Sequence, residues 1–233
     1  MNLLALDTST EFLSLALQVG DEKGCDKTYT HYQHAGQAAS QLVLPQIQAL
    51  LDSEKITLKD LDGIAFGAGP GAFTGVRVAC GVAQGLGFGA NLPVVGVNTL
   101  LALAQASGHE RVIACLDARM GEIYHAAFER KNGEWIEQSI TRVCKPEAAP
   151  VLDGAWAGVG SGWAVYTEVL SKIYAINLTK TLSNITPTAE AILQLAAPIF
   201  VAGEAKPASE AAPIYIRNRV ALTTIEREAG QSL

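Results

Sequence analysis

The stretch GAGPGAFTG, residues 67–75, has the composition of a loop that binds phosphate. Its glycines fit the GxGxxG/A pattern, and it follows an apolar run and precedes an expected helix, whose first N–H groups would attract an anion. Two features count against a nucleotide. No Asp or Glu occurs between Asp62 and Glu110 to bind a ribose hydroxyl, and Pro70 removes one backbone donor. The Gly-Lys-Ser/Thr sequence of a P-loop is also missing, so we predict that the loop serves another purpose.

Two aspartates stand at equivalent places in a sequence that looks duplicated. Asp7 ends the apolar run LLALD, and Asp117 ends RVIACLD. Each is followed later by a loop of the pattern GxGxG, which is GAGPG at 67–71 and GVGSG at 158–162. Either aspartate could simply bond the N–H groups of the next turn, and as a pair they could also frame a magnesium ion. The repeat itself indicates two lobes of one design.

Hydrophobic periodicity places these landmarks on an α/β fold. The expected elements of the first half are strands at 3–7, 12–19, 28–32, 63–66 and 94–97, with helices at 38–51, from 73 and from 99. The second half shows a strand, a turn and a strand over 111–129, then an apolar strand before 158 and a helical run at 164–173. We therefore predict two β-β-β-α-β-α lobes, residues 1–104 and 105–213, with residues 214–233 returning to complete the first.

Composition limits the classes of function. The chain has 233 residues, 49% hydrophobic and 17% charged, and its net charge of −6 predicts a poor nucleic-acid binder on its own. Its cysteines lie far apart without a CxxC pair, which favours reduced thiols and a cytoplasmic location. Glycines, Asn91 and Pro93 interrupt the apolar stretch 78–104, so we expect no membrane span there. Residues 203–213 have the composition of a linker.

The helix expected after the glycine loop has two different sides. Val78, Val82 and Leu86 suit the core, whereas another side collects small and polar residues at spacings of three and four. Those residues are Thr74, Arg77, Gly81, Gln84 and Gly85. Glycine costs about 1 kcal/mol per helical position relative to alanine, which suggests that another backbone approaches closely. A helix of the same domain could supply that backbone, but we favour a helix of a partner protein.

Several motifs together resemble one family along nearly the whole chain. The chain is similar to the bacterial TsaB family, also called YeaZ, in the motifs LALDTST, GAGPGAFTGVRVACGVAQGL, LDARMGEIY, GVGSGW and PIYIRNRVA. The resemblance implies the duplicated, RNase H-like fold of actin, the sugar kinases and the heat-shock ATPases. It also implies a non-catalytic subunit of the machinery that places threonylcarbamoyl on N6 of adenosine 37 in tRNAs reading codons that begin with A.

The same resemblance implies the partners. In that family, TsaD performs the transfer, the small P-loop ATPase TsaE completes the assembly, and a separate synthase makes threonylcarbamoyl-AMP. TsaB meets TsaD through helices of its N-terminal domain and tends to pair with itself when TsaD is absent. We therefore expect a heterodimer with TsaD, a homodimer of the isolated chain, contact with tRNA only through the complex, and no membrane partner.

Departures from the catalytic relatives point to a non-catalytic role. TsaD holds a metal with an HxxxH pair, whereas residues 98–103 here read NTLLAL, without His, Asp, Glu or Cys. His31 and His34 would share a face only in a helix, so we expect no metal and no catalytic residue.

The nucleotide cleft of the actin fold is also altered. Actin-fold ATPases have glycines at the places where Thr8 and Ser9 follow the first strand of this chain. The resemblance implies no cofactor on this chain alone and leaves open an adenine nucleotide at the interface shared with TsaD. Any residual ligand cleft would consist of Asp7, Thr8, Ser9, Gly69, Gly71 and Asp117.

The residues alone leave two other functions open. An actin-fold phosphotransferase would turn over ATP without a partner, and a metal-dependent peptidase would cleave protein, although no nucleophile constellation is evident.

Two motifs have open roles as well. Arg119, Glu122 and Tyr124 could form a site, but a tight turn between paired strands explains the same pattern. Arg217 and Arg219 could bind carboxylates of the first lobe or help a partner to hold tRNA.

Overall fold

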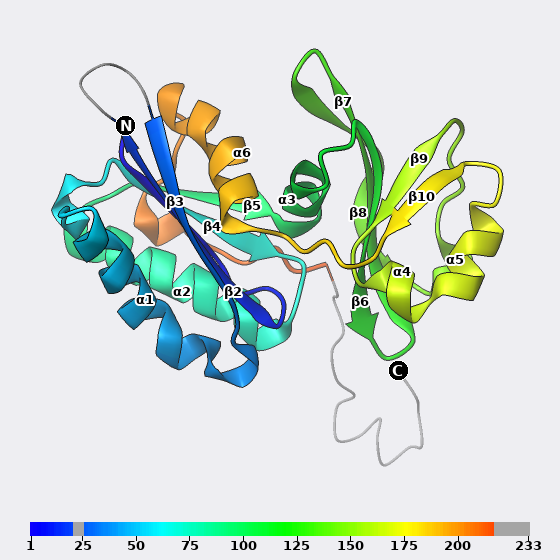
Figure 1. Ribbon diagram of the computed structural model, residues 1–233, viewed down its shortest axis with the longest axis horizontal. Helices are drawn as coiled ribbons and strands as arrows, with labels where there is room; N and C mark the ends of the chain where they lie inside the picture. The colour runs from blue at the N-terminus through cyan, green and yellow to red at the C-terminus, as the bar shows by residue number, and fades with distance from the viewer. Residues whose placement is uncertain (21–25, 217–233) are drawn as a thin grey trace.

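The chain folds into two lobes, each built around a five-stranded sheet (Figure 1). The structure is a computed structural model and describes residues 1–20 and 26–216. The first sheet has the strand order β3-β2-β1-β4-β5, and the second has the order β10-β9-β6-β7-β8. If the strands of each lobe are numbered from the lobe's own first strand, both sheets have the order 3-2-1-4-5. The first strand of each lobe, β1 or β6, therefore lies at the centre of its sheet. The duplication predicted from the sequence is therefore confirmed.

The first lobe follows the hydrophobic pattern closely. In chain order its elements are β1 (Leu3–Asp7), β2 (Phe12–Gly20), β3 (Asp26–His34), α1 (Ala39–Ser53), β4 (Gly63–Gly69), α2 (Phe73–Ala90), β5 (Val94–Asn98) and α3 (Thr99–Ala106). The strands β1 and β4 are buried along their whole length because helices cover both faces of the sheet. In contrast, β3 lies at the sheet edge and alternates between exposed and half-buried residues.

The second lobe repeats the strand order but departs from the predicted β-β-β-α-β-α plan, because only the short 3₁₀ turn Pro146–Ala148 lies between β8 and β9. Its elements are β6 (Arg111–Arg119), β7 (Glu122–Lys131), β8 (Glu134–Cys144), β9 (Trp156–Val159), α4 (Gly162–Val165), α5 (Thr167–Ile173), β10 (Leu178–Leu182) and α6 (Ala189–Val201). The helical run expected at 164–173 is broken at Tyr166, whose φ of −117° and ψ of 36° are not helical. Met120 and Gly121 join β6 to β7 with positive φ values of 56° and 75°. This is the conformation of a two-residue hairpin turn, so the turn interpretation of the motif LDARMGEIY is confirmed.

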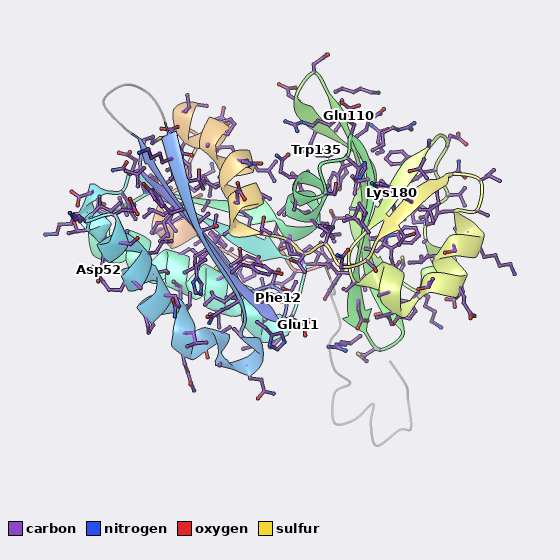
Figure 2. The ribbon with its side chains drawn as sticks, viewed as in Figure 1. Glu11, Phe12, Asp52, Glu110, Trp135 and Lys180 are labelled. Carbon is purple, nitrogen blue, oxygen red and sulfur yellow. The ribbon has the colours of Figure 1, made fainter. Side chains whose placement is uncertain are left out.

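Each sheet also packs against a helix from the other half of the sequence. The helices α1 and α2 cover one face of the first sheet, whereas α6 covers the opposite face through residues such as Ile192. Conversely, α3, which belongs to the first half of the sequence, packs against the second sheet through Leu103. The two helices meet where Gln105 Nε2 donates to Gln194 Oε1 at 2.6 Å. Trp135 of β8, which Figure 2 labels, donates to Gln105 Oε1 at 2.7 Å. Packed helices therefore join the lobes.

Residues 204–215 form a strap along the first lobe. Val94 N donates to Lys206 O at 2.7 Å, and Lys206 N donates back to Val94 O at 2.9 Å. Further along, Ile214 N donates to Ala68 O at 2.7 Å near the end of β4. The linker predicted at 203–213 is wrong, because backbone bonds to strands far away in the sequence hold this segment, and composition does not reveal such bonds.

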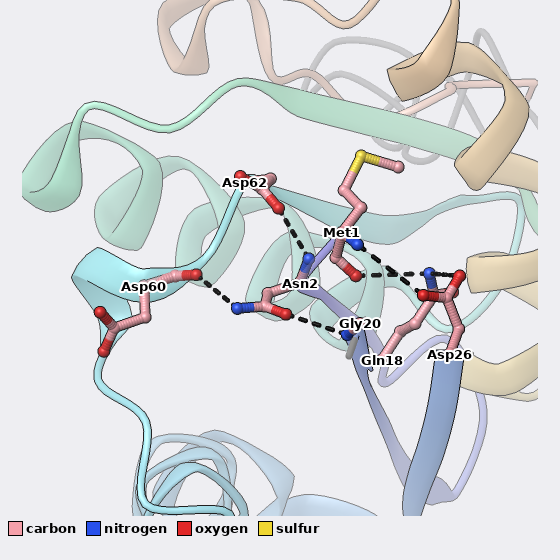
Figure 3. Close-up of polar contacts among 7 residues, drawn as sticks. All are labelled: Met1, Asn2, Gln18, Gly20, Asp26, Asp60 and Asp62. Atoms are coloured by element: carbon pink, nitrogen blue, oxygen red, sulfur yellow. Dashed lines mark hydrogen bonds and ion pairs between the residues drawn. The ribbon is translucent and has the colours of Figure 1, made fainter. Parts of the chain in front are cut away.

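Polar contacts fix the start of β1 (Figure 3). Asn2 N donates to Asp62 Oδ2 at 2.7 Å, and Asn2 Nδ2 donates to Asp60 O at 2.8 Å, which ties β1 to the residues before β4. Gly20 N donates to Asn2 Oδ1 at 3.1 Å, which ties β1 to the end of β2. With the register set at this end, Asp7 lies at the opposite end of β1, beside the glycine loop.

Two further findings bear on the sequence analysis. No helix in the described ranges is long and apolar enough to cross a membrane. The thiols of Cys80, Cys115 and Cys144 are free. One of the four cysteines, Cys25, lies outside the described ranges, as do Arg217, Arg219 and the rest of residues 217–233, which belong to the segment expected to complete the first lobe.

Candidate functional site

The glycine loop packs directly onto the first turn of the chain, between β1 and β2. Thr8 Oγ1 donates to Gly75 O at 2.6 Å, and Ala72 N donates to Ser9 O at 2.7 Å. A Cβ atom at Gly75 would overlap the Thr8 carbonyl oxygen, and one at Gly71 would lie 2.5 Å from Ser9 O. Glycine is required at both positions because the two backbones touch. The pattern that resembles a phosphate loop is thus explained by packing against this turn.

Two backbone N–H groups of the loop already have acceptors within the protein. Gly69 N donates to Thr99 Oγ1 at 3.0 Å, Ala72 N is bonded to Ser9, and Pro70 has no N–H. An anion at this place would have to displace both bonds, whereas helix N-termini that bind phosphate leave such donors free. Gly69, Pro70 and Ala72 therefore offer no free N–H group to a phosphate, whereas the first turn of α2 has no side-chain cap.

Asp7 is buried against the loop. Its Oδ1 accepts from Ser9 N at 3.0 Å and from Ser9 Oγ at 2.8 Å, whereas Oδ2 has no partner among the described residues. A Cβ atom at Gly67 would overlap this carboxylate, and α6 brings Ile192 to the same place. Burial raises the pKa of Asp7 from 3.8 to about 6, and the bonds from Ser9 oppose that rise only in part. Protein atoms therefore cover the carboxylate.

Asp117, the counterpart in the second lobe, bonds its own turn. Arg119 N donates to Asp117 Oδ1 at 2.9 Å, and Arg119 Nη1 lies 3.4 Å from Oδ2. Asp117 N donates to Ser161 Oγ at 3.2 Å, in the loop GVGSG. Both aspartates thus accept from the N–H group two residues further on, as strand-end residues do in turns. No hydrogen bond or ion pair of the described chain links Asp7 to Asp117.

Histidines and acidic residues do not gather into a metal site. Within residues 1–20 and 26–216, no three His, Cys, Asp or Glu side chains lie close enough to hold a metal ion. His31 and His34 lie on β3, so the odd spacing puts them on opposite faces of the sheet. Asn98, the first residue of NTLLAL, caps α3 by accepting from Leu100 N at 2.8 Å. This segment therefore begins a helix and offers no metal ligand.

The outward side of α2 carries the residues predicted to dock a partner. We call this side the docking face, and it consists of Thr74, Arg77, Gly81, Gln84 and Gly85. Thr74, Gly81 and Gly85 are exposed, and Arg77 and Gln84 are half-buried. A Cβ atom at Gly81 or Gly85 would meet no heavy atom within 4 Å. The described part of the chain therefore places no helix of the same domain against these glycines, and docking by a partner stays a prediction.

Three aromatic residues that were not among the predicted docking residues lie beside the docking face. Phe73 is 60% exposed and Phe88 is 62% exposed, near the two ends of α2. Their spacing from Arg77 and Gly85 continues the period of three and four, so helical periodicity could have found them. Tyr215 reaches Arg77 from the strap. No local pattern indicates this contact, because it joins residues far apart in the sequence.

The chain has relatives among known proteins. Residues 30–222, more than half of the chain, match the family model described as TsaD, tRNA N6-adenosine threonylcarbamoyltransferase. The chain is 38% identical to the tRNA threonylcarbamoyladenosine biosynthesis protein TsaB of Escherichia coli K12, over 95% of this chain and 96% of that protein. It is 41% identical to the protein of the same name from Haemophilus influenzae, over 94% and 95% of the two chains.

Solved structures show the same likeness. YeaZ from Pseudomonas aeruginosa matches with a TM-score of 0.80 at 38% identity, over 92% of this chain and 99% of that one. A second structure from the same organism, described as an uncharacterized protein with similarity to peptidase YEAZ, gives a TM-score of 0.84 at 39% identity, over 93% and 99% of the chains. The duplicated actin-like, RNase H-like fold expected from the sequence is therefore confirmed.

Proposed function

Because the chain belongs to the TsaB family of tRNA threonylcarbamoyladenosine biosynthesis proteins, we propose that it is a non-catalytic subunit that acts with TsaD. In this role it is a platform for TsaD, which places threonylcarbamoyl on N6 of adenosine 37 in tRNAs that read codons beginning with A. TsaE completes the assembly in the cytoplasm. The isolated chain pairs with itself when TsaD is absent, and it meets tRNA only through the complex.

The observation that carries this proposal is the open space over α2. Gly81 and Gly85 are one helical turn apart, and nothing in the described chain lies within 4 Å of a Cβ atom at either position. Glycines weaken an exposed helix, so their presence is explained if a partner helix packs against them. A specific interface buries about 800 Å² per partner. The exposed rings of Phe73 and Phe88 extend the docking face toward both ends of α2.

The closed first turn supports a non-catalytic role. Thr8 and Ser9 bond the glycine loop, and the Asp7 carboxylate is covered by Gly67 and α6. Two backbone donors of the glycine loop, Gly69 N and Ala72 N, are thus used internally. We infer that the isolated chain binds no nucleotide, and that any adenine nucleotide of the assembly binds where this chain meets TsaD.

Neither alternative function gains support from the site. A phosphotransferase acting alone needs an open phosphate cradle, and the contacts of Ala72 and Gly69 occupy two of the loop's donors. A metal-dependent peptidase needs ligands for its metal, and the described residues contain no cluster of three potential ligands.

Deletion of the gene, followed by mass spectrometry of tRNA nucleosides, tests the proposal. We expect threonylcarbamoyladenosine to be depleted, and we expect the wild-type gene and an Asp7→Asn variant to restore it. Gly81→Leu should restore it poorly, because TsaD could no longer dock. Normal levels of the modified nucleoside in the deletion strain would contradict the proposed function.

A further inference from the structure

Arg77 contacts two aromatic rings at the edge of the docking face. Its guanidinium carbon lies 3.3 Å from the centre of the Phe73 ring and 4.9 Å from the centre of the Tyr215 ring. Arg77 Nη1 donates to Phe73 O at 2.9 Å, one helical turn earlier. Both rings are largely exposed, Phe73 by 60% and Tyr215 by 58%. Contact with two rings restricts the guanidinium, and the Arg77 residue is half-buried.

The charge of Arg77 has no counterion in the described chain. Arg77 is the only charged residue between Asp62 and Glu110. None of the ion pairs among residues 1–20 and 26–216 includes it. A guanidinium has several N–H donors, and a bond to Phe73 O uses one of its nitrogens. Its other N–H groups form no hydrogen bond with the described residues, so they are available to an acceptor from outside the chain.

We propose that Phe73, Arg77 and Tyr215 form an arginine clamp that binds a carboxylate of the docking partner. A carboxylate can accept two parallel hydrogen bonds from the guanidinium fork. The two rings hold the fork in place before the partner arrives, so less side-chain freedom is lost on binding. The clamp rests on the proposed function, since it takes TsaD as the protein that supplies the Asp or Glu side chain.

A carboxylate fits the clamp better than an RNA phosphate. Surfaces that bind nucleic acid gather several Lys and Arg residues. Within the docking face, all of whose residues are described, Arg77 is instead the one charged side chain, and the whole chain has a net charge of −6. A partner helix could place its backbone over the glycines and its acidic side chain on Arg77. Apolar side chains of that helix would then cover the rings of Phe73 and Tyr215.

The strap makes the clamp a composite of both halves of the sequence. Tyr215 follows directly after Ile214, whose N–H bonds Ala68 O at 2.7 Å. Lys206 anchors the other end of the strap to Val94. The segment that returns from the second half therefore contributes directly to the docking surface, and Tyr215→Leu should weaken docking although it lies outside α2.

The clamp is tested by titrating this chain with purified TsaD in a calorimeter, which measures the Kd of the complex. Arg77→Gln should raise Kd at least about tenfold, and Arg77→Lys should raise it several-fold, because lysine keeps the charge but loses the fork and the stack. Arg130→Gln is the matched control. Arg130 also lies over an aromatic ring, Trp135, but in the second lobe, so this change should leave Kd unaltered. Thermal melting on the same samples should show that all variants stay folded.

Charge reversal identifies the group that the clamp binds. Arg77→Glu should abolish the complex, and an Asp→Lys or Glu→Lys change at one surface position of TsaD should restore it. A wild-type Kd for Arg77→Gln, with binding lost in Gly81→Leu, would overturn the clamp and leave the proposed platform standing. Unchanged Kd for TsaD, with weaker tRNA binding by the assembled complex, would overturn the carboxylate in favour of phosphate. Failure of the wild-type chain to bind TsaD would overturn the proposed function itself.

Discussion

His125 Nε2 lies 2.9 Å from the hydroxyl oxygen of Tyr174, and both side chains are fully buried in the second lobe. The Tyr174 hydroxyl donates to Pro150 O at 2.7 Å, so it must accept from His125, whose Nε2 carries the proton. His125 Nδ1 has no partner among the described residues. Protonation would therefore create a buried N–H group without an acceptor, and burial lowers the pKa of His125 to about 4.

We predict that His125 makes the protein less stable as the pH falls. The unfolded chain takes up this proton near pH 6.5 and the folded chain only near pH 4, so the free energy of unfolding decreases through that window, by about 3 kcal/mol in total. His125→Gln, which can still donate to Tyr174, should lose this dependence. Urea unfolding between pH 4 and 7.5 measures it, and equal slopes for wild type and variant would contradict the prediction.

Asp7 should have the opposite dependence. Its pKa is about 6 in the folded chain against an ordinary 3.8, so the folded state binds the proton more tightly. The stability that protonated Asp7 contributes at low pH is lost as the pH rises from about 4 to 6. Asp7→Asn keeps an acceptor for Ser9 and removes the buried charge. It should therefore raise the free energy of unfolding at pH 7.5 by about 1 to 3 kcal/mol.

The control for that change is Asp117→Asn, the same substitution at the matching strand end of the second lobe. Asp117 is less deeply buried and its carboxylate lies beside Arg119, so the control should not reproduce the gain. A loss of stability in Asp7→Asn at pH 7.5 would indicate that the ionised Asp7 carboxylate has a favourable partner.

Gly81→Leu should weaken docking without destabilising the fold. The position is open, and leucine forms helices better than glycine by up to about 1 kcal/mol, so Tm should not fall. The added side chain should block close approach and weaken both TsaD binding and self-pairing by about tenfold or more. Gly87→Leu on the same helix is the control, because a Cβ atom there would lie 2.8 Å from Ala208 Cβ, and Tm should drop. A destabilised Gly81→Leu with unaltered affinity would contradict the docking face.

Gly75→Ala should reveal how tightly the glycine loop packs on the first turn. Its Cβ atom would overlap the Thr8 carbonyl oxygen, so the free energy of unfolding should fall by about 1 to 3 kcal/mol. Gly89→Ala, in the same helix but facing open space, should be neutral or stabilising by up to about 1 kcal/mol. Chemical denaturation of the two variants makes the comparison. Similar stabilities would mean that the loop can relax away from Thr8.

Local patterns were sufficient to predict much of the first lobe. Apolar runs predicted β1, β2 and β5 nearly to the residue, because each strand packs helices against its faces. The edge strand β3 extends further at both ends than the expected 28–32, since its exposed residues carry little hydrophobic signal. The outer strands β8 and β10 were missed for the same reason.

Contacts between distant residues could not be predicted in this way. Ala189 N, at the start of α6, donates to Ser14 Oγ at 2.8 Å, which places a helix of the second half on the first sheet. Tyr215 lies over Arg77 for a similar reason, through the bonds of the strap. The candidate residues of the site were thus identified, but their burial and partners depend on chain segments that no local pattern connects.

Reconstitution of tRNA modification from purified components tests the central claim most directly. Unmodified tRNA and threonylcarbamoyl-AMP would be incubated with TsaD and TsaE, with and without this chain, and threonylcarbamoyladenosine would be measured by mass spectrometry. We predict product only when TsaD and this chain are both present, and none from this chain alone. Modification by the chain alone, or a full yield from TsaD and TsaE without it, would contradict its role as a non-catalytic platform.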